Sequence, residues 1–132
     1  MGSRKSPPAL TVFPASESST LQVRVVFHET PQALQATWAL INGFTASNVV
    51  AFCVTDKPGN ADNLCATMHF CDTGAKRIEH ECFHAVLAYA RHSHLNPEHI
   101  PAEELMAEAY ETIIKGVRAA VRARRASRRQ SR

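Results

Sequence analysis

Two histidines and a glutamate, His80, Glu81 and His84, have the spacing of the zinc-binding motif H-E-x-x-H. The segment around them has no Pro or Gly from Ala75 to Arg91, which predicts a helix. On a helix, residues four apart lie on one face, so both imidazoles can face one metal ion. Glu81 lies where its carboxylate can reach a metal-bound water as a general base. The alternative is a surface helix on which two histidines happen to have this spacing.

Apolar residues recur at helical spacing along the same segment and predict its buried face. They are Ile78, Cys82, Ala85, Val86 and Tyr89. The two histidines form a neighbouring stripe, so they should lie at the edge of the core with one side open, as a catalytic zinc requires. Cys82 is offset by about 160° or more from each histidine, so its thiol should face the core and not the metal.

A third ligand is needed, because catalytic zinc commonly takes two His, one Glu and a water. Glu104 lies 20 residues after His84, at the start of a second helix that the sequence predicts over residues 102–121. The gap leaves room for a loop and a returning helix. Glu103 and Glu108 remain alternatives as the ligand, since each residue turns a helical side chain by about 100°.

The sequence resembles the gluzincin metallopeptidases, the thermolysin-like zinc peptidases, in three features. These are the motif His80-Glu81-x-x-His84, the interval of 20 residues from His84 to Glu104, and the pair Glu104-x-x-x-Glu108. The resemblance implies a minimal zincin fold with Zn²⁺ bound by His80, His84 and Glu104. It also implies that Glu108 orients a ligand histidine, at a position where the family has Asp. The implied activity is hydrolysis of a peptide or protein substrate by metal-activated water, with Glu81 as general base. Compact H-E-x-x-H proteins of phages and mobile elements are similar to this chain in size.

A second class of function stays open, because a short chain offers little room for substrate subsites. In that class the domain is a non-catalytic zincin-like module whose role is binding. Three further histidines, His92, His94 and His99, fall in a predicted loop and are expected to be solvated.

The predicted fold is a single α+β domain with the order β-α-β-β-α-α. Its elements are strands at 21–28, 49–55 and 64–71 and helices at 31–42, 75–91 and 102–121. Thr30-Pro31 starts the first helix and Asn42-Gly43 ends it. The strand Leu64–Cys71 has two interpretations. The resemblance implies an edge strand that pairs with extended substrate, whereas its apolar character equally suits an interior strand.

The two ends of the chain differ in composition from the middle. Residues 1–20 are rich in Pro and Ser and are predicted to be disordered, which places the folded domain at 21–121. Residues 117–132 hold seven Arg and no acid, a charge of +7, whereas residues 1–116 hold 8 basic and 12 acidic residues, a charge of −4. The Arg-rich tail, 122–132, is therefore predicted either to contact nucleic acid or another acidic surface, or only to aid solubility.

No signal-peptide pattern and no run of 18 apolar residues occurs, which predicts a cytoplasmic protein without a membrane partner. The four cysteines form no C-x-x-C pair and are expected to be reduced. They are Cys53, Cys65, Cys71 and Cys82.

Overall fold

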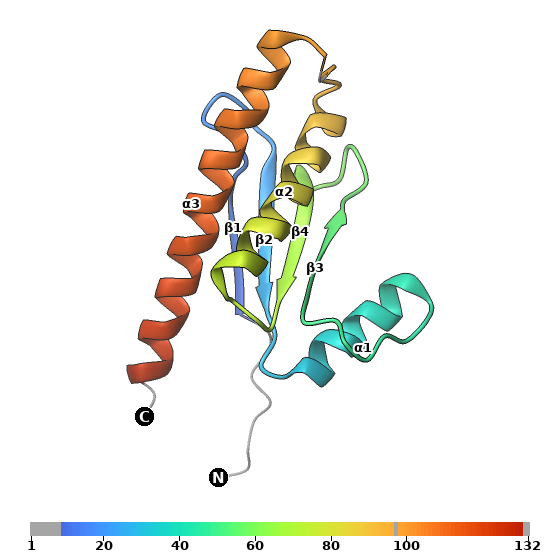
Figure 1. The fold of residues 1–132 in the computed structure, drawn as a ribbon, viewed down its shortest axis with the longest axis vertical. Helices are drawn as coiled ribbons and strands as arrows, with labels where there is room; N and C mark the ends of the chain where they lie inside the picture. Colours follow the sequence, from blue (N-terminus) through green and yellow to red (C-terminus); the bar gives the residue numbers. More distant parts are fainter. Residues whose placement is uncertain (1–8, 97, 131–132) are drawn as a thin grey trace.

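The computed structural model of the chain describes residues 9–96 and 98–130, whose elements follow in the order β-β-α-β-β-α-α (Figure 1). The strands are β1 (Ala9–Pro14), β2 (Gln22–Phe27), β3 (Ala51–Thr55) and β4 (Leu64–Phe70), and the helices are α1 (Pro31–Asn42), α2 (Ala75–His92) and α3 (Ile100–Gln130). The α+β class predicted from the sequence is confirmed.

The four strands form one sheet in the order β1-β2-β4-β3. The central neighbours β2 and β4 are parallel, and the two outer pairs are antiparallel. The carboxyl ends of β2 and β4 therefore lie at the same end of the sheet, next to the start of α2 and the last turns of α3 (Figure 1).

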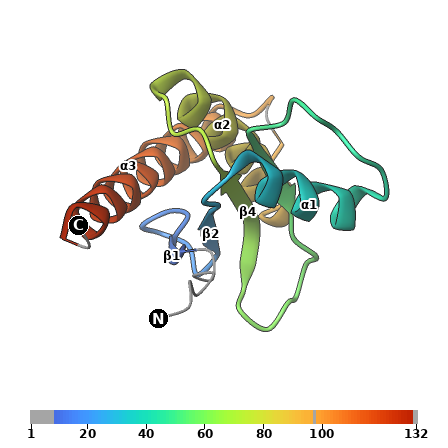
Figure 2. The same cartoon turned by 90° about the horizontal axis from the view of Figure 1, so that it is seen from below.

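Helices α2 and α3 pack together against one face of the sheet, where the core lies. Phe27, Met68 and Phe70 from the strands are almost fully buried there, together with Cys82 of α2 and Ile113 of α3. Figure 2 shows α2 and α3 side by side and α1 apart from them.

Helix α1 belongs to the opposite face of the sheet. Its Trp38 ring contacts Phe52 of β3 edge-on, and Phe52 in turn stacks on His69 of β4. Their chain neighbours Cys53 and Met68 pack with the core under α2, and successive side chains of a strand point to opposite faces. The chain therefore leaves β2 toward one face of the sheet and leaves β4 toward the other.

Local signals set the ends of α1 as predicted. The Thr30 side chain accepts a hydrogen bond from the Ala33 amide at 3.1 Å, and Pro31 follows at the first helical position. Gly43 ends the helix with φ of 80°, a left-handed conformation in which a β-carbon would be strained.

The prediction that residues 1–20 lie outside the fold is wrong for residues 9–14. They form β1, which pairs with β2 from Ala9↔Phe27 to Pro14↔Gln22. The Phe13 ring lies directly against Gly116 of α3, where an added β-carbon would be 2.4 Å from a ring atom. Residues 1–8 of the predicted disordered segment lie outside the described residues.

The predicted boundary between the domain and an Arg-rich tail at 122 is also wrong. Helix α3 continues without a break to Gln130, and Arg124 lies against the sheet with its side chain only 13% exposed. The segment is helical because tertiary contacts extend a stretch that already favours helix. No helix in the described part of the chain is both long and apolar enough to cross a membrane.

Candidate metal centre

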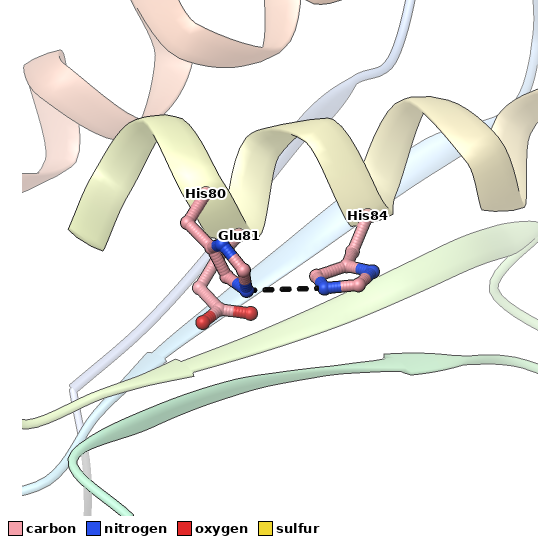
Figure 3. Close-up of side chains that lie close together, drawn as sticks. All are labelled: His80, Glu81 and His84. Atoms are coloured by element: carbon pink, nitrogen blue, oxygen red, sulfur yellow. Dashed lines mark hydrogen bonds between the residues drawn. The ribbon is translucent and has the colours of Figure 1, made fainter. Parts of the chain in front are cut away.

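The structure brings His80 and His84 together on the solvent side of α2 (Figure 3). Their Nε2 atoms are 3.2 Å apart and both side chains are exposed. The apolar residues of the same helix, Ile78, Cys82 and Ala85 among them, face the core, as the periodicity predicted. The histidines therefore lie at the edge of the core with one side open.

Glu81 points into the same space from a buried position. It is only 3% exposed, and its carboxylate and the two imidazoles offer ligand atoms within 4.8 Å of one another. Burial raises the pKa of its carboxyl group, and the charges of His80, His84 and Arg77 oppose that rise. A carboxylate with a raised pKa is better suited to accept a proton near neutral pH.

The spacing of the two imidazoles fits a zinc ion. Zinc binds histidine nitrogen at about 2.0–2.1 Å, and two ligands at a tetrahedral angle are then about 3.3 Å apart. The observed Nε2–Nε2 distance is 3.2 Å. The donor set of two imidazoles and a nearby carboxylate also suits zinc, so the residues present fit this metal.

The structure corrects the prediction that Glu104 is the third ligand. Within the described residues, the group able to hold a metal contains His80, Glu81 and His84, and neither Glu104 nor its alternative Glu103 belongs to it. Both glutamates are exposed, near the first turn of α3.

The packing of α3 explains the error. Cys82 of α2 is buried in one cluster with Ala109 and Ile113 of α3, and the two helices pack together, so α3 runs along the side of α2 that carries Cys82. That side is about 160° or more around the helix from each histidine. In Figure 3 the side chains of His80 and His84 lie on one side of α2, and α3 passes on the other side. Helix α3 therefore packs on the face of α2 that points away from the histidines, and its glutamates cannot supply a metal ligand.

Glu108 does not orient a ligand histidine either. Its carboxylate accepts a hydrogen bond at 3.4 Å from the Ser16 hydroxyl, in the turn between β1 and β2. It therefore ties α3 to the sheet. The same turn lies in the segment that was predicted to be disordered, so this partner of Glu108 was not expected.

Of the two interpretations of the strand at 64–71, the structure contradicts the edge strand and supports the interior strand. Strand β4, residues 64–70, is buried along its whole length between β2 and β3, so its interior interpretation is confirmed. Strand β3 (Ala51–Thr55) is the edge strand on this side of the sheet and packs against α2. The Cys82 thiol is fully buried and outside the metal group, as predicted.

Two features near the ends of β2 and β4 were missed by the sequence analysis. The buried rings of His28 and His69 stack, and His28 Nε2 lies 2.9 Å from His69 Nδ1. Three arginines of α3 also line a cavity at the ends of these strands. No spacing rule could have found either feature, because the sheet register and the path of α3 bring residues from distant segments together.

A scan against models of known protein families found no match to this chain, and searches of curated proteins and of solved structures found none either.

Proposed function

We propose that the chain is a zinc-dependent peptidase in which His80 and His84 hold the metal and Glu81 acts as general base. The observation that supports it is the 3.2 Å Nε2–Nε2 distance on the open side of α2, with a buried carboxylate facing the same space. Burying a carboxyl group costs free energy, so the buried Glu81 beside two surface histidines is not expected if their spacing arose by chance.

The residues divide the chemistry between them. Zinc, when bound, supplies Lewis acidity, which makes water acidic and polarises a peptide carbonyl. His80 and His84 bind through neutral imidazole nitrogens and leave the solvent side free for substrate. Glu81 takes the proton of the attacking water and passes it to the leaving amine. Burial favours this exchange, because it raises the pKa of Glu81 toward the working pH.

A peptide substrate is favoured by the neighbouring strand. Strand β3 is at the edge of the described sheet and packs against α2, which carries the metal group. Its outer side can pair with an extended peptide through main-chain hydrogen bonds. Such pairing would lay a peptide bond beside the two histidines.

The test combines zinc content with cleavage of a peptide library. The Glu81→Gln variant should keep its zinc and lose roughly 100-fold or more of its activity, the usual contribution of general acid–base catalysis. Glu79→Gln, an exposed position on the same helix, is the matched control and should cleave at the wild-type rate. His84→Ala should lose zinc and activity together. Wild-type turnover by zinc-loaded Glu81→Gln would remove Glu81 from the mechanism.

A second candidate is a zincin-like binding module without catalysis. It is favoured by the position of Glu104, because the described chain then offers two imidazoles where catalytic zinc sites commonly have three protein ligands. Stoichiometric zinc without cleavage of any library peptide would select this candidate. Zinc-dependent cleavage that Glu81→Gln abolishes would select the peptidase.

A further inference from the structure

A cavity of about 80 Å³ opens at the carboxyl ends of the parallel strands β2 and β4. The chain leaves β2 through Phe27–Glu29 toward α1 and leaves β4 through Cys71–Thr73 toward α2, on opposite faces of the sheet. In sheets that contain parallel strands, this divergence opens a crevice in which ligands bind. The cavity is separate from the metal group, since none of its lining residues belongs to that group.

The lining of the cavity is strongly basic. Helix α3 contributes Arg124, Arg125 and Arg128, and Glu29 is the one carboxylate among the described residues that line it. Three guanidinium groups against one carboxylate leave a formal charge of +2. His28 and Thr73 add polar groups from the two strand ends.

Two of the three arginines, Arg124 and Arg128, are held in place before any ligand arrives. The Arg124 guanidinium lies 5.0 Å above the centre of the Phe27 ring, and its side chain is 13% exposed. Glu29 contacts Arg124 at 3.4 Å and Arg128 at 3.0 Å with its two carboxylate oxygens. Burial, and then the charge of Arg128, lower the pKa of Arg124, and the charge of Glu29 opposes this shift.

We propose that this cavity is a binding site for a phosphate group. Guanidinium groups bind phosphate through paired, charge-assisted hydrogen bonds, and Arg is preferred where that geometry is needed. The cavity is several times larger than the space that one water requires, which suits a tetrahedral oxyanion better than a whole nucleotide. The phosphate would take the place that the Glu29 carboxylate now holds between Arg124 and Arg128.

The phosphate could belong to a small molecule or to a nucleic-acid strand. Four exposed arginines, Arg118, Arg122, Arg125 and Arg129, follow one face of α3 at helical spacing. They could contact further phosphates of a strand that starts at the cavity, and this contact would not select a sequence. A small phosphorylated ligand would use the cavity alone.

Titration calorimetry with inorganic phosphate at constant ionic strength tests the site. Arg128→Gln, at a half-exposed position, should weaken binding at least fivefold, and Arg129→Gln, one residue along and outside the cavity, should change it less than twofold. Glu29→Gln should tighten binding at least threefold, because the competing carboxylate is removed. No measurable phosphate binding, or equal losses from Arg128→Gln and Arg129→Gln, would overturn the proposal.

A single-stranded 12-nucleotide DNA probe distinguishes the two sources. If the phosphate belongs to a nucleic-acid strand, DNA should bind more tightly than inorganic phosphate, and both Arg128→Gln and Arg129→Gln should weaken DNA binding. If the source is a small molecule, DNA should bind no better than phosphate does. DNA binding that Arg128→Gln leaves unchanged would exclude nucleic acid as the source of the phosphate, since the cavity would take no part in that binding. Because none of these readouts uses zinc or peptide cleavage, they are independent of the proposed peptidase activity.

Discussion

His69 should make the protein sensitive to acid. Its side chain is 8% exposed on the sheet face opposite α2, with its ring stacked 4.5 Å from that of Phe52 and its Nδ1 atom 2.9 Å from His28 Nε2. Burial, and then the charges of His28 and Arg24, lower the pKa of His69 from 6.5 to about 4. The folded protein therefore keeps this ring neutral under conditions in which the unfolded chain protonates it.

The sign and size of the effect follow from proton linkage. A lowered pKa contributes stability above pH 6.5, and this stability is lost as the pH falls toward 4, because only the unfolded state binds the proton in that window. With about 1.4 kcal/mol for each pKa unit, the loss reaches roughly 2.5 kcal/mol at pH 4.5. Such a loss is a large fraction of the stability of a small domain.

Urea unfolding at pH 7.5 and pH 4.5 measures this loss of stability. His69→Gln keeps a polar group beside His28 and removes the titrating ring, so its free energy of unfolding should fall about 2.5 kcal/mol less than that of the wild type over this interval. His94→Gln, at an exposed loop position, should follow the wild type. Equal pH dependence of the wild type and His69→Gln would show that His69 is not held neutral by the fold.

Two further predictions concern elements that position the site. Gly116→Ala should lower the free energy of unfolding by about 1 kcal/mol, because the new β-carbon would overlap the Phe13 ring and the overpacking outweighs the gain in helix propensity. A stabilised variant in urea unfolding would mean that Phe13 does not pack on α3. Thr30→Ala should cost about 1 kcal/mol through loss of the α1 N-cap. Thr37→Ala, whose hydroxyl donates to the Ala33 carbonyl within the same helix, should change stability by less than about 0.5 kcal/mol. Equal effects of the two threonine changes in the same assay would contradict the capping role.

The sequence alone located the elements that depend on neighbouring residues. The Thr30-Pro31 start and the Gly43 stop of α1 are backbone signals that act over a few residues, and α1 begins and ends where they predict. The placement of His80, Glu81 and His84 is also local, because a helix fixes the relative directions of side chains four residues apart. For this reason the candidate metal group could be predicted without a fold.

Only the tertiary structure decided which residues from distant parts of the sequence contact each other. Glu104 has the right spacing from His84 along the chain, but α3 packs on the side of α2 that carries Cys82, so the carboxylate is kept away from the histidines. The short run at residues 10–13 is rich in β-forming residues but lies between prolines in a Pro- and Ser-rich segment, and its pairing with β2 and the contact of Phe13 with Gly116 make it a strand. Arg124 and Arg128 are part of the fold because Phe27 and Glu29 hold Arg124 and Glu29 also contacts Arg128. Packing angles and strand register depend on the sum of many weak contacts, and no short sequence pattern encodes that sum.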